Sequence, residues 1–276
     1  MPSALDLLVH WQLDPAVLVS ALAVVGLYGW GVVRVERSHP SWRSLCFALG
    51  VLAVLTALLS GLDGWAERLL SVHMAQHLVL VFVAAPLLVA GAPVSLALRA
   101  LPRDDARALA RALRSRPVRV LVNPAIAWTL FGAVTLATHL TGFYELALQH
   151  PLIHALEHLL YLGSAILFWL PALGGEPLPY RLGFVARMVY VLGAMPAMAF
   201  VGIALVLESS LRYPSYAAPA RALGIDALAN QHAAGMLMWS GSGLLAAALT
   251  IIAAWSALMR EERRQLAREA RLGGAP

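Results

Sequence analysis

Histidines gather at the ends of the long apolar segments of this chain. His73 and His77 open one segment at a spacing of i and i+4, which places both imidazoles on one face of a helix. His154 and His158 repeat that spacing in another segment. Three more histidines lie at the same boundary of their segments: His139, His150 and His232. Imidazole binds zinc, copper, iron and haem, so this layer predicts a shared metal or haem site.

One carboxylate accompanies these histidines. Glu157 stands beside His158, deep inside an apolar segment, where an ionisable side chain is a candidate functional group. It would orient a ligand imidazole, carry a proton or bind the ion directly; the alternative is a simple hydrogen bond between helices. Gln76 and Gln231 are candidates for the same supporting role. We assign no residue a catalytic role.

Nearly all of the sulfur atoms in this chain are thioethers of methionine. Cys46 is the single cysteine, so neither an internal disulfide nor a paired-cysteine metal site can form. Thioether sulfur favours copper(I), which makes three methionines near the histidines auxiliary copper candidates: Met74, Met236 and Met238. The alternative for each methionine is that it fills space in the core.

The composition excludes an ordinary soluble domain. Hydrophobic residues make up 60% of the 276 residues and charged residues 13%, against about 45–50% and about 25% in globular chains. Apolar runs recur along the chain, and each is long enough to cross a hydrocarbon core of ~30 Å as a helix. The formal net charge of +5 is explained by membrane topology, so we expect no nucleic-acid partner.

These runs predict an all-α integral membrane protein, a seven-transmembrane-helix bundle that forms one polytopic domain over residues 1–276. The approximate spans are 15–33, 44–62, 73–98, 120–139, 151–171, 184–207 and 230–258. Prolines inside spans are expected to kink them: Pro86, Pro93 and Pro196. The first arginine is Arg34, so we expect the first run to remain as a helix and not to be a cleaved signal peptide.

The placement of arginine predicts the orientation. Of the 20 basic residues, all but three follow the first, third, fifth or seventh span; the exceptions are Arg68, Arg212 and Arg221. Cytoplasmic loops are enriched in basic residues. We therefore expect an N-terminus outside, a cytoplasmic C-terminus, and the histidine layer at the outer face of a bacterial inner (plasma) membrane. His39 is expected inside, and His10 is expected at the surface, apart from the layer.

Residues 103–116 predict a short amphipathic helix at the inner leaflet. Leucine and alanine share one face, and Arg107, Arg111 and Arg114 share another. Asp104, after Pro102, is the expected N-cap. Such a helix lies on anionic lipid or forms a docking surface for a partner.

The same motifs resemble a known family, the CtaG type of cytochrome c oxidase assembly factors, which is associated with caa-type terminal oxidases. The resemblance extends from about residue 60 to 258. It rests on His73-Met74-Ala75-Gln76-His77, Ala85-Pro86-Leu87-Leu88, the stretch from His139 to Tyr144, His154-Ala155-Leu156-Glu157-His158, Phe168-Trp169-Leu170-Pro171, and the stretch from Asn230 to Trp239. The pairing of HMxQH with HxxEH at this separation is specific.

The resemblance implies a multispanning protein that helps an oxidase mature at its copper centre. The chain departs from the family pattern in three places. Asn230 stands where the family commonly has Asp, Ala234 where it has the first of two glycines, and Leu140 where a proline follows a histidine. His150 is additional to the pattern. The metal ligands ranked first are therefore His73, His77, His154 and His158, with His139, His150 and His232 as further candidates.

Together these features predict a non-enzymatic assembly factor for a haem–copper cytochrome c oxidase. It would bind copper at the extracytoplasmic His/Met site and aid delivery of the ion to the oxidase. The expected partners are oxidase subunits and membrane lipid. The alternatives are a haem-binding membrane redox protein, a membrane metalloenzyme with Glu157 as base, or a proton-linked metal transporter, with haem or zinc in place of copper.

Overall fold

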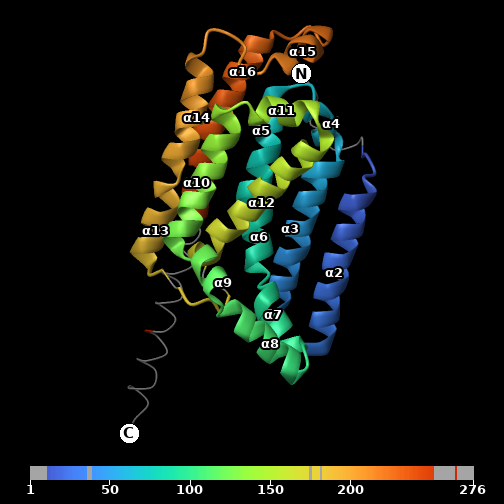
Figure 1. Cartoon of the computed structure of the whole chain (residues 1–276), viewed down its shortest axis with the longest axis vertical. Coiled ribbons are helices and arrows are strands. Elements are labelled where there is room, and N and C mark those ends of the chain that lie inside the picture. Colours follow the sequence, from blue (N-terminus) through green and yellow to red (C-terminus); the bar gives the residue numbers. More distant parts are fainter. Residues whose placement is uncertain (1–10, 36–38, 174–175, 181, 252–264, 266–276) are drawn as a thin grey trace.

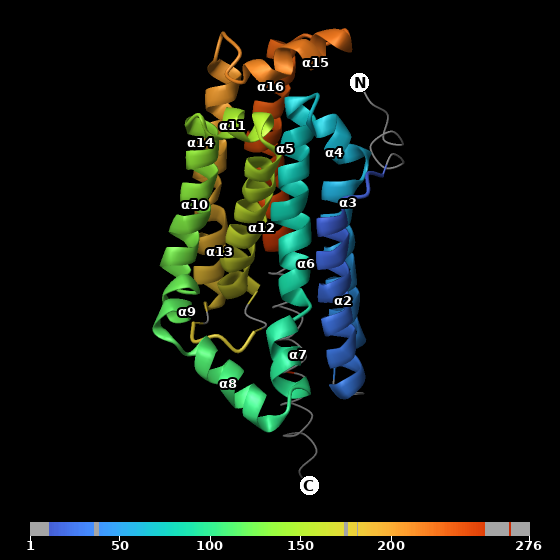
Figure 2. The ribbon, with the colours of Figure 1, turned by 45° about the vertical axis from the view of Figure 1, so that its right-hand side comes forward.

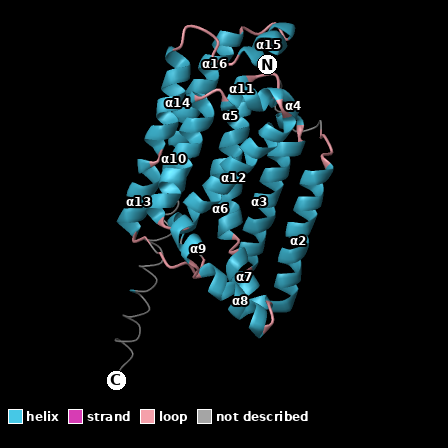
Figure 3. Ribbon diagram, in the orientation of Figure 1, coloured by secondary structure: helices cyan, strands magenta, loops and turns pink. Residues whose placement is uncertain are grey.

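A computed structural model of the chain describes residues 11–35, 39–173, 176–180, 182–251 and 265. The long helices follow one another up and down the molecule (Figure 1), and within the described residues every regular element is a helix (Figure 3). Three features expected from the sequence lie outside this part: His10, the end of the last span beyond residue 251, and the C-terminal arginines.

The long helices form the body of the molecule. They are α2 (Pro15–Val35), α3 (Ser41–Leu59), α5 (Leu70–Val79) with η2 (Leu80–Ala84), α6 (Ala85–Ala90) and α7 (Pro93–Ala100), α10 (Pro124–Leu140), α12 (Pro151–Leu173), α13 (Phe184–Gly193) with α14 (Met195–Leu207), and α16 (Ala227–Met236) with η4 (Leu237–Gly241). The connecting helices are α4 (Gly61–Ala66), α8 (Arg103–Leu113), α9 (Arg116–Leu121), α11 (Phe143–Gln149), η3 (Pro214–Tyr216) and α15 (Ala217–Ala222).

In the described residues, 6 helices are long and apolar enough to cross a membrane: Pro15–Val35, Ser41–Leu59, Leu70–Ala100, Pro151–Leu173, Phe184–Leu207 and Ala227–Ile251. Helix α10 has 17 residues, and it qualifies only together with α11, relative to which it is bent by 70°. The protein is thus an all-helical membrane protein with 6 candidate spans, or up to 7 if the bent pair is one span. The expected count of seven depends on that pair.

The outer surface of α2 is apolar along its length. Val19, Leu22, Leu27 and Val33 are each between 66% and 78% exposed. A continuous apolar surface of this kind is rare on a protein surrounded by water. It fits contact with lipid hydrocarbon, as the hydropathy of the helix indicates.

The prolines predicted inside spans mark changes of helix type. Ahead of Pro86 lies the π-helical turn η2, in which the N–H of Ala85 donates to the carbonyl of Leu80. The next carbonyl in this pattern is that of Val81, which Pro86 cannot satisfy because it has no N–H. The indole Nε1 of Trp169 on α12 donates to this carbonyl instead, at 2.7 Å. The interrupted helix is thereby joined to α12.

At the two other prolines a new helix begins. Ala92 adopts a left-handed conformation with φ of 51°, and Pro93 then begins α7. Pro196 lies in the first turn of α14, directly after the break from α13 at Ala194. A proline in a first helical turn loses no intrahelical hydrogen bond, because the N–H groups of that turn have no helical partner.

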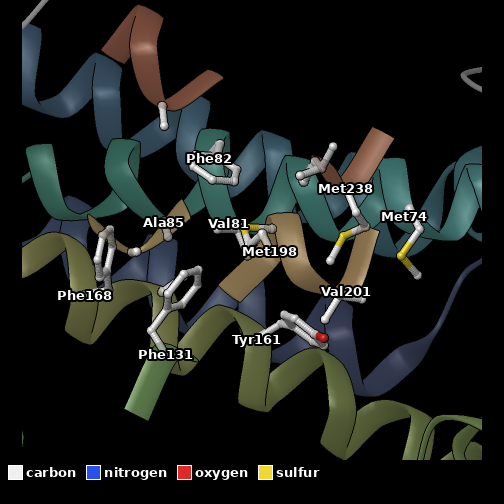
Figure 4. Close-up of a cluster of buried hydrophobic side chains, with 14 of the residues drawn as sticks. Met74, Val81, Phe82, Ala85, Phe131, Tyr161, Phe168, Met198, Val201 and Met238 are labelled. Atoms are coloured by element: carbon white, nitrogen blue, oxygen red, sulfur yellow. The ribbon is translucent and has the colours of Figure 1, made fainter. Parts of the chain in front are cut away.

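The main core is formed between α5, η2, α6, α10, α12, α14 and η4. Figure 4 shows its central side chains, which include Met74, Phe82, Phe131, Phe168, Met198 and Met238. Helices α14 and α16 approach most closely at Gly202 and Gly235. A Cβ atom on Gly202 would lie 2.5 Å from the carbonyl oxygen of Gly235, and one on Gly235 would lie 2.6 Å from that of Gly202. Small residues permit this backbone contact between membrane helices.

The expected amphipathic helix at residues 103–116 is α8, and it ends at Leu113. None of its residues is buried. The expectation that Asp104 caps it was wrong: Pro102 occupies the N-cap position, and Asp104 lies in the first turn. There its carboxylate accepts a hydrogen bond from Arg107 at 2.8 Å. The helix begins two residues earlier than an N-cap at Asp104 would require, because Pro102 fixes the extended entry to Arg103.

The two ends of the molecule differ in their arginine content. Helices α8 and α9 lie at one end, and α4, α11 and α15 lie at the other (Figure 2). The arginine-rich segment from Arg99 to Arg119 belongs to the first end, whereas Arg68, Arg212 and Arg221 belong to the second. For the arginines named here, the division of basic residues seen in the sequence thus corresponds to the two ends of the helix bundle.

Candidate metal centre

Helices α5 and α12 place four histidines and one glutamate together, and we call His73, His77, His154, His158 and Glu157 the histidine cluster. The ring centroid of His73 lies 5.2 Å from that of His154 and 5.9 Å from that of His158. The rings of His154 and His158 are 4.4 Å apart. The i, i+4 spacing on each helix therefore does present both pairs to each other across the interface between α5 and α12.

The geometry offers two overlapping sets of ligand atoms. One atom each from His73, His154 and His158 lie within 4.8 Å of one another, and the same holds for His73, His77 and Glu157. His73 belongs to both sets. Metal bonds to nitrogen and oxygen are about 2.0–2.2 Å long, so two ligand atoms of one ion lie at most about 4.4 Å apart. Small side-chain rotations would therefore bring either set onto one ion.

Several nitrogen and oxygen atoms of the cluster that could bind a metal have no hydrogen-bond partner among the described residues. They are His77 Nδ1, His154 Nε2, His158 Nε2, and both carboxylate oxygens of Glu157. Glu157 is fully buried, and its Oε2 lies 4.0 Å from His73 Nε2. Buried polar atoms are ordinarily paired, because an unpaired one loses its hydration without compensation. Such a concentration of unpaired nitrogen and oxygen atoms is typical of an ion-binding site.

The side chain of Tyr216 sets the orientation of His73. Its hydroxyl donates to the carbonyl oxygen of Ala66 at 3.1 Å and lies 2.8 Å from His73 Nδ1. Burial raises the pKa of the Tyr216 phenol well above its ordinary value, so the phenol keeps its proton. The carbonyl of Ala66 can only accept; with the phenol proton given to it, the hydroxyl accepts from His73 Nδ1–H. The lone pair of His73 is then on Nε2, which faces the cluster.

The tautomer of His77 follows from that of His73. The two Nε2 atoms are 3.0 Å apart. Because His73 Nε2 carries a lone pair, His77 Nε2–H is the donor between them, and His77 Nδ1 is left as a buried acceptor without a partner. The ring of His77 also stacks on Tyr161, with centroids 4.2 Å apart. An ion bound at His73 Nε2 would therefore replace the hydrogen bond from His77.

His139, from the end of α10, lies beside the cluster. Its ring centroid is 6.2 Å from that of His77, and it is fully buried. Its Nδ1 lies 3.0 Å from the carbonyl oxygen of Thr135 and 2.8 Å from the hydroxyl of Tyr161. Its Nε2 lies 3.4 Å from the sulfur of Met74.

The two remaining histidine candidates are not brought to the cluster. The side chain of His150 is exposed at the turn before α12. His232 is half-buried on α16, where its Nε2 lies 3.0 Å from the carbonyl oxygen of Glu208. Its contacts are therefore with the end of α14.

The side chain of Gln76 makes its hydrogen bonds to other helices and not to the imidazoles. Its amide nitrogen donates to the carbonyl oxygen of Ala57 at 2.8 Å and to the carboxylate of Asp63 at 2.7 Å. Burial raises the pKa of Asp63 to about 6, against the opposing effect of the hydrogen bond from Gln76. The polar contacts of Gln76 thus hold α5 against α3 and α4.

Gln231 and the methionines also fall into separate environments. Gln231 accepts from the backbone N–H of Arg212 and donates to the carbonyl oxygen of Ser210. Met236 is 45% exposed, and Met238 is fully buried in the main core. Of the three methionines proposed as copper ligands, Met74 is the one whose sulfur contacts a histidine nitrogen.

The structure adds supporting residues that the sequence analysis missed. Tyr216 is 143 residues from His73, and neither periodicity nor spacing connects the two. Tyr161 had a visible signal, since it follows His154 and His158 on the same stripe of α12, one turn deeper. Thr135 and Thr138 precede His139 by one helical turn or less, where a hydroxyl or carbonyl can reach its ring.

Most of the chain is similar to known proteins. Residues 26–260 match the family described as cytochrome c oxidase caa3 assembly factor (Caa3_CtaG). Uncharacterized proteins from Mycobacterium bovis and Mycobacterium tuberculosis are each 29% identical over 281 residues, and one from Mycobacterium leprae is 29% identical over 287 residues. Each alignment covers 98% of this chain and 42% of the relative, so the chain spans about two fifths of their length. None of the solved structures matches the chain significantly.

Proposed function

This chain belongs to the family of cytochrome c oxidase caa3 assembly factors, and on that premise we propose that it binds copper at the histidine cluster and aids its delivery to a haem–copper oxidase. Copper is then the cargo of the protein. The role is assembly and not catalysis, and oxidase subunits are the partners that receive the ion.

The observation that carries this proposal is the set of unpaired donor atoms in the buried cluster. His154 Nε2, His158 Nε2 and both oxygens of Glu157 lack partners among the described residues, and the tautomer of His73 points a further lone pair at them. Neutral imidazoles are good ligands for copper and zinc. Glu157 would offset the positive charge of the ion or bind it directly.

The donor set suits transfer of an ion. The cluster is built without cysteine, so the ion would be held by neutral nitrogens and one carboxylate. When the ion leaves, His77 Nε2–H can donate to His73 Nε2, so the lone pair that the ion has left is again hydrogen-bonded. His77 therefore lowers the cost of the ion-free state, and release of the cargo does not leave every donor unpaired.

The close packing of the rings favours a bare ion over haem. His73 contacts His77, His154 and Tyr144, with ring centroids 4.5 to 5.2 Å apart. Side chains thus fill the space between the imidazoles where a porphyrin would have to lie.

The position of the cluster fits delivery at the extracytoplasmic face. His73 lies near the start of α5 and His154 near the start of α12, at the end of the bundle opposite the arginine-rich helix α8 (Figures 1 and 2). If basic residues mark the cytoplasmic side, the histidine cluster is at the outer side of a bacterial plasma membrane.

Alanine variants of the cluster test the function. His154→Ala and His158→Ala should each reduce the copper retained by the purified protein by about 10-fold or more, because each removes a ligand. In copper-limited cells, the same variants should lower terminal oxidase activity, and added copper should restore part of it.

His150→Ala is the matched control, because His150 is an exposed histidine just before the same helix. It should leave both copper content and oxidase activity unchanged. Full oxidase activity under copper limitation in a strain that lacks the protein would contradict the assembly role. Wild-type copper content in the two cluster variants would remove the histidine cluster from it.

A further inference from the structure

A second group of donors adjoins the histidine cluster. The Nε2 atom of His139 and the sulfur of Met74 are 3.4 Å apart, and both side chains are fully buried. Met74 directly follows His73 on α5, and the ring of His139 lies 6.2 Å from that of His77. The hydrogen atoms around His139 decide what this contact is.

The hydroxyl protons near His139 can be assigned in sequence. Thr138 donates its one hydroxyl proton to a backbone carbonyl, that of Val134 at 2.9 Å. Thr138 therefore accepts from the hydroxyl of Tyr161, 2.6 Å away. Tyr161 has then used its only proton, so its oxygen accepts from His139 Nδ1, 2.8 Å away.

The backbone agrees with this assignment. His139 Nδ1 also lies 3.0 Å from the carbonyl oxygen of Thr135, which can only accept. The hydroxyl of Thr138, 3.2 Å from Nδ1, has given its proton to Val134 and can also only accept here. The carbonyl of Thr135 and the hydroxyl of Tyr161 thus place the proton of the neutral imidazole on Nδ1. The lone pair of His139 is consequently on Nε2, the atom that faces the sulfur of Met74.

Two electron-pair donors therefore face each other in a buried position with no hydrogen atom between them. Bonds from a metal to nitrogen and sulfur are about 2.0 and 2.3 Å long, so donors 3.4 Å apart can both reach one ion. Thioether sulfur and imidazole nitrogen together favour copper(I), whereas zinc is bound by thiolate, imidazole and carboxylate.

We propose that Met74 and His139 form a second, softer metal-binding position beside the histidine cluster, which accepts copper(I). This inference rests on the proposed function and extends it. His77 lies between the two positions: its ring contacts both His73 and His139, and its Nδ1 has no partner among the described residues. Copper(I) can thus be held at two adjacent positions, of which only the second distinguishes it from zinc.

The test uses the full-length protein purified in detergent, in the wild-type form and as Met74→Leu. Leucine conserves the volume of methionine and removes the sulfur. Copper(I) is titrated under anaerobic conditions against a chromophoric copper(I) chelator, zinc is titrated separately, and X-ray absorption at the copper edge reports the ligand atoms. Met238→Leu is the control, because Met238 is also fully buried in the main core.

Wild-type protein and Met238→Leu should show a sulfur ligand to copper(I). Met74→Leu should lose it and bind copper(I) about 10-fold or more weakly, with zinc affinity unchanged. A sulfur ligand that persists in Met74→Leu, or that disappears in Met238→Leu, would overturn the proposal. Copper(I) bound by nitrogen and oxygen alone in the wild type would overturn it and leave the proposed function in place. Failure of the wild type to bind copper would overturn both.

Discussion

The orientation of individual side chains in this protein is set by neighbours that bind no ion. Tyr216 accepts the Nδ1 proton of His73, and Tyr161 accepts that of His139. In each case the hydroxyl proton is committed to another acceptor, Ala66 or Thr138. The imidazole therefore has one available tautomer, with its lone pair on Nε2. Partners of this kind are as important to a metal site as the ligands themselves.

Tyr216→Phe tests this control of the tautomer. The substitution removes the acceptor for His73 Nδ1–H, so we expect copper affinity to fall by about 10- to 100-fold. Tyr190→Phe is the control, because it also removes a buried hydroxyl, which donates to the carbonyl oxygen of Phe168 away from the cluster. Copper titration of the two purified variants decides the matter, and equal affinities would show that Tyr216 only contributes to packing.

At the scale of helices, backbone contacts determine how the bundle closes. Gly202 and Gly235 bring α14 and α16 together, and each would place a Cβ atom against the carbonyl oxygen of the other. Helix α16 also packs against α5, since Asn230 exchanges hydrogen bonds with Ser71. The approach of α14 to α16 therefore helps to hold the helix that carries His73 and His77.

Gly235→Ala should destabilise the protein by about 1–3 kcal/mol, because a methyl group cannot fit without moving α14. The matched control is Gly243→Ala, in the continuation of the same helix, where an added Cβ meets nothing within 4 Å. Thermal unfolding in detergent, followed by tryptophan fluorescence, should show a lowered midpoint for Gly235→Ala alone. Equal midpoints for the two variants would contradict the role of this contact.

At the scale of the whole molecule, hydropathy predicts where the long helices lie, because twenty apolar residues in succession have few alternatives to a membrane helix. It does not reveal that α10 is short and that α11 turns by 70°, since both segments are apolar. The i, i+4 spacing predicts that His73 and His77 share a face, but not that His139 joins them and His232 does not. That outcome depends on how the helices pack, which no local pattern contains.

The orientation in the membrane can be tested with cysteines placed at the two ends of the molecule. In a Cys46→Ser background, His150→Cys should react with a membrane-impermeant thiol reagent in intact cells, because it is exposed at the histidine end. Ala112→Cys, exposed on α8, should react only after the cells are opened. The opposite pattern would place the histidine cluster at the cytoplasmic face.

The π-helical turn η2 has one more consequence, which concerns the phase of the helix that carries His73 and His77. A π turn holds one residue more than the α turn that it replaces, and each residue rotates a helix by about 100°. The part before η2 can therefore face its histidines toward α12, while Ala85 and Val89 after it face the main core. Loss of one residue from Leu80–Ala84 would barely alter the hydropathy of this segment, yet it would rotate the two halves out of their shared alignment.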